Sequence, residues 1–120
     1  MDQAWALEQE FWQESSAGHA GAFYRRSMVT DGYVVVPSGI ISRDELIAKW
    51  DTHEPVTRYE LSEPRFTLVD GGNVLISYRV SVDAEWLPGY SAWMTALYTW
   101  EGAGWALACR THTPVNAFPF

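Results

Sequence analysis

The spacing of the apolar residues changes near residue 55, and this change limits the fold more than any other feature of the sequence. Before it, apolar side chains recur every three or four residues, which is the period of a helix packed on one side. After it, apolar and polar residues alternate, as in strands with one buried face. Helices followed by strands, rather than alternating with them, are typical of α+β proteins. We therefore expect one α+β domain over residues 1–120, with helices packed on an antiparallel sheet.

Two helices are expected at the start of the chain, over residues 2–15 and 18–30. The first would carry Ala4, Leu7, Glu8, Phe11 and Trp12 on one side. The second would end at Asp31-Gly32, because glycine adopts the left-handed stop conformation at little cost.

A short strand and a third helix complete the first half. The strand is expected at Tyr33–Val36, closed by Pro37, which cannot donate a hydrogen bond to a sheet. The helix should begin at Ser42 and run to about Asp51, because Ser42 and Glu45 form a capping box.

The strands expected in the second half are 56–61, 65–69, 74–82, 90–101 and 105–113. Pro64 interrupts the first two, so a bulge or bend is expected there. Asp70-Gly71-Gly72-Asn73 and Glu101-Gly102-Ala103-Gly104 indicate hairpins, because tight turns need positive backbone angles. In the first hairpin, Val69 should face Val74.

The register of the last hairpin assigns its side chains to two faces. With Gly102 and Ala103 as the turn, the facing pairs are Trp100–Trp105, Tyr98–Leu107, Ala96–Cys109 and Met94–Thr111. We expect this bulky face to lie under the helices. Arg110 and His112 would then point to the opposite face, since side chains alternate along a strand.

The opposite face is polar but also carries large apolar groups. These are Phe66, Leu68, Leu75, Trp93 and Leu97. Exposed apolar groups of this size are typical of an interface, so a homodimer is expected through this face. The alternative is that long neighbouring side chains shield them.

Composition excludes several classes of partner. The net charge is −7 and only eight residues are Lys or Arg, so neither nucleic acid nor an anionic membrane is an expected partner. Cys109 stands alone and cannot form an internal disulfide. No signal-peptide pattern and no apolar run of membrane-spanning length is present, so a cytoplasmic location is expected. Aromatic residues reach 15%, and some of these rings should line a cavity or an interface.

Four segments carry a resemblance to a known family. They are Asp31-Gly-Tyr-Val-Val-Val-Pro37-Ser-Gly39, Glu45-Leu-Ile-Ala-Lys-Trp50, Asn73-Val-Leu-Ile-Ser-Tyr-Arg-Val80 and Gly104-Trp105-Ala-Leu-Ala-Cys-Arg-Thr-His-Thr-Pro114. Together with the order of elements, they resemble the nuclear-transport-factor-2-like (NTF2-like) superfamily, most of all its SnoaL-like branch. The superfamily also includes ketosteroid isomerase and scytalone dehydratase. The resemblance implies a cone in which three N-terminal helices pack on a strongly curved antiparallel sheet of about five to six strands.

The resemblance also implies an internal pocket between the helices and the concave face of the sheet. The expected ligand-binding residues are Trp12, Tyr24, Met28, Tyr33, Trp50, Tyr59, Tyr78, Met94, Tyr98 and Trp100, with Val35 and Trp105 also on the wall. Tyr78 and Tyr98 would supply hydroxyl groups that orient a small hydrophobic ligand in an apolar site.

Catalytic residues stay open at this point. The family's ketosteroid isomerases use an aspartate before a proline as their base, but here Val36 precedes Pro37 and cannot accept a proton. If the protein is an enzyme, His112 and Tyr98 are the candidate acid/base residues. His19, His53 and His112 lack the spacing of metal ligands, so neither a metal nor another cofactor is expected.

Arg79 and Arg110 share one predicted face and allow two interpretations. On the outer face they would pair with acids such as Asp83 or Glu101 across a dimer, which we favour. Inside the cone, an arginine could hold the carboxylate of a ligand through two parallel hydrogen bonds.

Three functions are compatible with these features. The first is binding of a small hydrophobic cyclic molecule. The second is a lyase, isomerase or cyclase acting on such a molecule. The third is a non-catalytic dimeric scaffold.

Overall fold

The computed structural model describes residues 2–49, 56, 58–84 and 87–115. Its helices are α1 (Asp2–Ser16), α2 (Ala20–Ser27) and α3 (Arg43–Lys49), and its strands are β1 (Met28–Val36), β2 (Gly39–Ser42), β3 (Arg58–Val69), β4 (Asn73–Ala84), β5 (Leu87–Trp100) and β6 (Trp105–Pro114). Within the described ranges, no helix combines the length and apolar character that crossing a bilayer requires.

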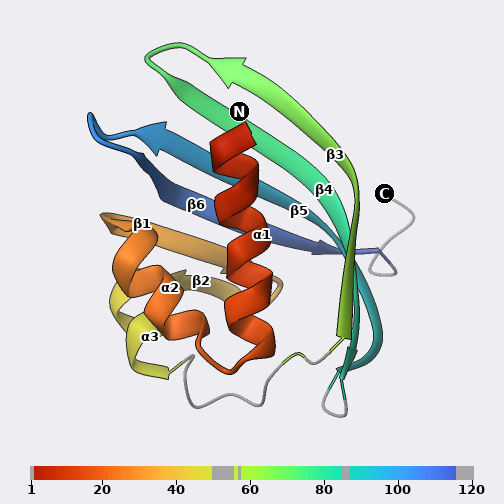
Figure 1. The fold of residues 1–120 in the computed structure, drawn as a ribbon. Helices are drawn as coiled ribbons and strands as arrows, with labels where there is room; N and C mark the ends of the chain where they lie inside the picture. The colour runs from red at the N-terminus through yellow and green to blue at the C-terminus, as the bar shows by residue number, and fades with distance from the viewer. Residues whose placement is uncertain (1, 50–55, 57, 85–86, 116–120) are drawn as a thin grey trace.

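The strands form one sheet in the order β2-β1-β6-β5-β4-β3. Every neighbouring pair is antiparallel except β1 and β6, which run parallel. Figure 1 shows the long strands β3, β4 and β5 curving past α1, while α2 and α3 lie beside β1 and β2. This arrangement of helices on the concave face of a curved sheet confirms the expected α+β cone.

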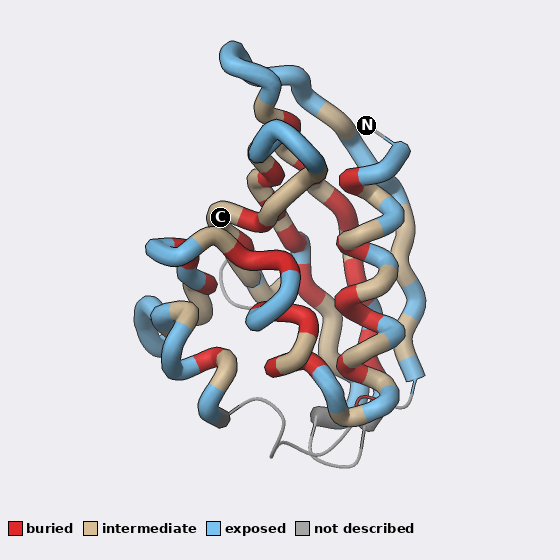
Figure 2. The backbone as a smooth tube through the Cα atoms, turned by 60° about the vertical axis from the view of Figure 1, so that its left-hand side comes forward, coloured by how far each residue is buried: buried red, intermediate tan, exposed pale blue. Residues whose placement is uncertain are grey.

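The core lies between α1 and the concave face of the sheet. Alternate residues of β4 and β5 point into it and are almost wholly buried: Val74, Ile76, Tyr78 and Val80 on β4, and Ala92, Met94, Ala96 and Tyr98 on β5. In Figure 2 the buried positions of α1 accordingly fall along one side of the helix. The two-residue alternation therefore predicted correctly which side chains of these two strands point to the concave face.

Two local signals in the sequence are confirmed. The Ser42 Oγ accepts a hydrogen bond from the backbone N–H of Glu45 at 3.3 Å, which is the N-cap contact of the expected capping box, and donates to the Glu45 carboxylate at 3.5 Å. The β3–β4 pairing shifts between Ser62 and Arg65, and Glu63 there has a positive φ of 55°. This irregularity is the bulge expected near Pro64.

The second expected helix is too long at its C-terminal end. The helix α2 ends at Ser27, and the chain becomes extended at Met28, which pairs with Leu107 of β6. Gly32 is therefore part of a strand and has no helix-stop role. A Cβ at this position would lie 2.4 Å from the Met28 Cγ, so glycine is required by packing instead.

The first hairpin has a register one residue away from the expected one. Val69 pairs with Asn73 and Phe66 pairs with Ile76, because Gly71 and Gly72 both adopt positive φ in a three-residue turn. Phe66 therefore lies on the concave side and packs against the core, instead of on the outer face. Leu68 pairs with Val74 on that same side but is exposed.

The last hairpin contains a bulge that the sequence pattern does not reveal. Tyr98 pairs with Leu107 as expected, but Leu97 then pairs with Cys109, so Ala108 is an extra residue in β6. From Cys109 onward, the expected pairing of β6 with β5 is therefore wrong by one residue. Ala96 pairs with Arg110 and Met94 pairs with His112, which places both polar side chains on the concave face.

Candidate functional site

A fully buried ion pair occupies the interior of the cone. Glu8 of α1 and Arg110 of β6 both have 0% exposed side chains. The Arg110 guanidinium donates from Nε to Oε2 of Glu8 at 2.8 Å and from Nη2 to Oε1 at 2.7 Å. Both carboxylate oxygens are thus held by one guanidinium group, the strongest geometry for such a pair.

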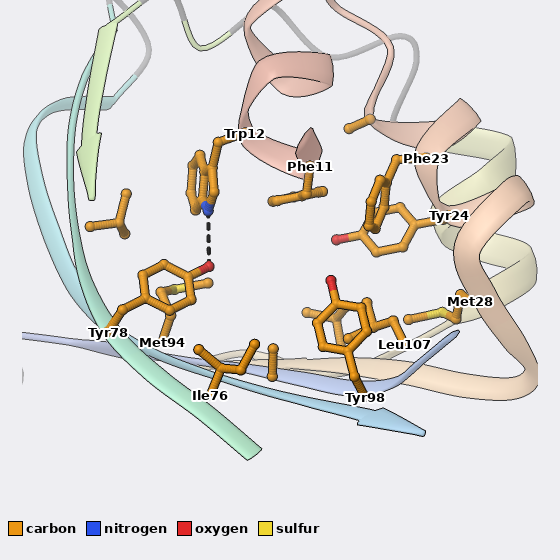
Figure 3. Close-up of a cluster of buried hydrophobic side chains, with 14 of the residues drawn as sticks. Phe11, Trp12, Phe23, Tyr24, Met28, Ile76, Tyr78, Met94, Tyr98 and Leu107 are labelled. Carbon is orange, nitrogen blue, oxygen red and sulfur yellow. Dashed lines mark hydrogen bonds between the residues drawn. The ribbon is translucent and has the colours of Figure 1, made fainter. Parts of the chain in front are cut away.

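Tyrosine hydroxyl groups complete the surroundings of this pair. Tyr98 donates to Oε1 of Glu8 at 2.6 Å, and Tyr78 donates to Oε2. The Tyr24 hydroxyl oxygen accepts a hydrogen bond from Nη1 of Arg110 at 2.6 Å. Figure 3 shows these three hydroxyl groups pointing into one central space from α2, β4 and β5.

Two aromatic residues of α1 connect the ion pair to its surroundings. The Trp12 indole donates from Nε1 to the Tyr78 hydroxyl oxygen at 2.9 Å, as the dashed line in Figure 3 marks. The Phe11 ring lies under Arg110, with its centroid 3.7 Å from the guanidinium carbon, a cation–π contact. Among the described residues, no buried side-chain nitrogen or oxygen lacks a hydrogen-bond partner.

These contacts fix the protonation of the network. Burial by itself would raise the pKa of Glu8, but the charge of Arg110 and the hydrogen bonds from Arg110, Tyr78 and Tyr98 lower it below the ordinary 4.5. Burial raises the pKa of Tyr24 to about 12 and, together with the charge of Glu8, raises the pKa of Tyr78 and Tyr98 well above 10.0. At neutral pH, Glu8 and Arg110 are therefore charged and the tyrosines are neutral donors.

A pocket of about 280 Å³ adjoins this network at one end of the cone. We call it the aromatic pocket; its lining residues are Phe11, Trp12, Ser15, Val36, Pro37, Val56, Val82, Tyr90, His112 and Pro114. Phe11 and Trp12 belong to both features, because each contacts a residue of the network and also lines the pocket. The ion pair thereby holds one wall of the pocket in place.

His112 is the lining residue with the most altered acidity. Burial and the nearby charge of Arg110 lower its pKa from 6.5 to about 4, although the charge of Glu8 acts in the opposite direction. Its imidazole is therefore neutral at neutral pH, and it can both donate and accept a hydrogen bond. Burial also raises the pKa of Tyr90, so the described lining carries no charge at neutral pH.

The structure separates the sequence-predicted binding residues into groups. Trp12, Tyr24, Met28, Tyr78, Met94 and Tyr98 are buried around the interior, and Tyr59 is half-buried with its ring 5.9 Å from that of Trp12. Tyr33 is 39% exposed and Trp100 is 46% exposed, so neither is enclosed by the cone. Trp50 and His53 lie outside the described residues.

The expected roles of the tyrosines and of Arg110 need revision. Tyr78 and Tyr98 point into the interior as expected, but both donate to Glu8 of the chain itself. The favoured outer-face position of Arg110 is wrong, because the bulge at Ala108 turns it inward. Arg79 does lie on the outer face, with its guanidinium carbon 5.8 Å from the centroid of Trp93.

Glu8 is the residue that sequence reasoning missed, although a signal was present. It stands within the apolar side of α1, where an unpaired charge would be costly to bury. A carboxylate in that position requires a basic partner from the surface it packs against, and Arg79 on β4 and Arg110 on β6 were among the basic residues of the strands. Among the described residues, no group of three or more His, Cys, Asp or Glu side chains could share a metal ion.

Sequence comparison finds no matching family and no matching curated protein. Comparison of structures does find matches. An NTF2-like protein from Cytophaga hutchinsonii superposes with a TM-score of 0.82 at 12% identity, covering 95% of this chain and 97% of that one. ActVI-ORFA from Streptomyces coelicolor superposes with a TM-score of 0.72 at 15% identity, covering 95% and 96%.

The chain has the NTF2-like fold. A third match with this fold is the CaMKII hub homology domain of Chlamydomonas reinhardtii, with a TM-score of 0.73, 14% identity and coverage of 95% and 97%. At identities this low, the superpositions establish only the NTF2-like architecture that was expected from the sequence. They leave function to be argued from the site, because one fold supports many functions.

Breaking the ion pair from either side should destabilise the protein strongly. We expect Glu8→Gln and Arg110→Met each to lower the free energy of unfolding by about 3–5 kcal/mol, because each leaves one buried group without its partner. The double variant should lose much less free energy of unfolding than the sum of the two single losses, because neither charged group is then left buried without its partner. Urea unfolding measures all three. Arg26→Met is the matched control: it breaks the surface ion pairs with Glu10 and Glu14 and should cost only about 1 kcal/mol. Additive losses at Glu8 and Arg110 would contradict the coupling.

The acid sensitivity of the protein should depend on His112. Its pKa of about 4 in the folded protein is below its ordinary 6.5, so the unfolded chain binds more protons between these values. The free energy of unfolding should therefore fall as the pH falls through this window. In His112→Gln it should depend less steeply on pH between about pH 7 and 5. The lowered pKa of Glu8 changes the stability of the protein below the ordinary carboxyl pKa of 4.5, which is outside that pH range. Urea unfolding at a series of pH values is the measurement, with His19→Gln as the exposed control. Equal slopes for His112→Gln and the wild type would refute this role.

Proposed function

We propose that the protein binds a small, uncharged, largely apolar molecule in the aromatic pocket. The observation that carries this proposal is a pocket walled by rings and aliphatic side chains, with one neutral imidazole directed at it. Binding sites for small molecules generally combine such an apolar lining with a few polar groups that fix orientation. His112 and the Ser15 hydroxyl are the polar groups available here.

The size and charge of the pocket limit the ligand. At about 280 Å³ it is near the lower limit of roughly 300–1,000 Å³ for ligand sites, which suits a single or fused ring. A charged ligand is disfavoured, because the described lining offers no opposite charge and the charges of Glu8 and Arg110 already neutralise each other. A ring bearing a hydroxyl or carbonyl group that hydrogen-bonds His112 fits this environment.

An enzyme acting on such a molecule is the second candidate, favoured by the presence of His112 in the pocket. A lyase, isomerase or cyclase would need His112 to accept a proton. A pKa of about 4 makes the imidazole a weak base at neutral pH, whereas efficient general bases have pKa values near the working pH. Binding without chemistry is therefore the preferred function. Tyr98, the other candidate acid/base residue, is engaged with Glu8.

The outer face of the sheet supports a homodimer. Leu75, Leu97 and Cys109 form a half-buried row across β4, β5 and β6. Trp93 lies further along the same face of β5, beyond Thr95, and is 42% exposed. An exposed tryptophan on the same face as an apolar row is typical of an interface. One protein of the same fold is a hub homology domain, which agrees with self-association. A scaffold role would use this same face.

Filling the aromatic pocket should abolish ligand binding. Val36→Phe adds a ring to the lining, whereas Val35→Phe makes the same change on the opposite face of β1 and is the matched control. The probes are neutral mono- and bicyclic alcohols and ketones, with 1-naphthol as the first. NMR titration should show saturable shifts of the His112 ring and Trp12 indole signals in the wild type and Val35→Phe, and none in Val36→Phe. If no probe shifts these signals in the wild type, or if both variants bind equally, the proposal fails.

Replacing Trp93 should dissociate the dimer. We expect sedimentation to give twice the chain mass of 13.6 kDa for the wild type and the chain mass itself for Trp93→Asp. A charge placed in an apolar contact loses its hydration without gaining a partner, so association weakens. Trp100→Asp is the control, because this tryptophan is similarly exposed but lies at a hairpin end. A monomeric wild type, or dissociation by both changes, would rule out an interface at Trp93.

A further inference from the structure

We propose that Arg110 and its surrounding hydroxyl groups form a carboxylate-binding site, and that Glu8 occupies it as a tethered ligand. The donors converge on two oxygen atoms: Arg110 holds both, Tyr98 donates to one and Tyr78 donates to the other. A guanidinium fork with two hydroxyl donors is the arrangement that recognises a free carboxylate. Glu8 supplies the acceptor from a separate element.

None of the groups that donate to Glu8 lies on α1. Arg110, Tyr98 and Tyr78 come from the adjacent strands β6, β5 and β4, and Tyr24 of α2 fixes the guanidinium through Nη1. The alternating pattern of these strands determines where the hydroxyl groups point, since Tyr78 and Tyr98 lie in the fully buried rows of the sheet. The donors thus belong to the sheet and their orientation is supported by α2, whereas α1 brings Glu8 together with Phe11 under Arg110 and the Trp12 indole on Tyr78.

Stability alone does not account for this arrangement. A buried ion pair gains little over a well-packed apolar pair of the same volume, because removing two charges from water offsets most of their attraction. The described core around it is otherwise apolar and aromatic. A set of donors arranged on one carboxylate is instead what a binding site requires, namely groups held in place before the ligand arrives.

The occupied site determines what the protein can accept. While Glu8 is present, Arg110, Tyr78 and Tyr98 are all engaged with its carboxylate, so a dissolved carboxylate is excluded from them. This inference does not depend on ligand binding in the aromatic pocket, whose lining includes Phe11 and Trp12 but neither Glu8 nor any group that donates to it. The two proposals can therefore fail separately.

Glu8→Ala is the variant that vacates the site. The change removes Cγ, Cδ and both oxygens, which are the non-hydrogen atoms of acetate. We expect acetate at neutral pH to raise the melting temperature of Glu8→Ala by several degrees in a saturable manner, relative to chloride at equal ionic strength. Acetamide has the same shape without the charge and should have no such effect. Butyrate is too long for the vacated space and should bind more weakly.

Two matched proteins complete the experiment. The wild type should show no acetate-specific shift because Glu8 fills the site, and Glu8→Ala/Arg110→Met should show none because the guanidinium is gone. If Glu8→Ala is unfolded alone, folding that requires acetate also supports the proposal. The titration is then repeated in trimethylamine N-oxide, which favours the compact state. Absence of an acetate-specific effect on Glu8→Ala under both conditions, or an equal effect of acetamide, would overturn the proposal.

Discussion

The contact between Glu8 and Arg110 is the constraint on which the arrangement of this protein depends. It joins the first helix to the last strand, and its hydroxyl partners bring in α2, β4 and β5. Burying two charges is tolerable when every donor and acceptor is satisfied, and that requirement fixes the relative positions of five elements at once. A small displacement of α1 would leave a charge without its partner. The helix therefore has one position along the sheet, whereas apolar contacts alone would allow several.

The same contact explains where an open space is found. In a cone of this kind the interior between helix and sheet is the natural place for a ligand. Here the chain's own ionic and phenolic groups fill that place, and the aromatic pocket lies beside it, at the ends of β1 and β6. Phe11 and Trp12 form the boundary, because each contacts the network and also lines the pocket. The polar interior thus acts as a rigid support for an apolar site.

The sequence predicts the elements better than it predicts this site. The apolar side of α1, the capping box at Ser42 and the bulge near Pro64 are local signals, and the structure confirms each. The bulge at Ala108 depends on pairing with two neighbouring strands at once, and nothing in a run of alternating residues marks it. One inserted residue reverses every later side chain, so Arg110 and His112 move from the outer face to the interior.

Shared architecture leaves open what the interior of such a cone contains. Proteins at 12–15% identity superpose over almost the whole chain, so the helices and the curved sheet need few particular residues. The content of the interior depends on far fewer positions: an acid in the apolar side of α1, a base on β6 and the extra residue that turns it inward. Because the acid and the base neutralise each other, the neighbouring pocket is left without a charge to attract ions. Its selectivity must then come from shape and from His112, a neutral imidazole that can donate or accept one hydrogen bond.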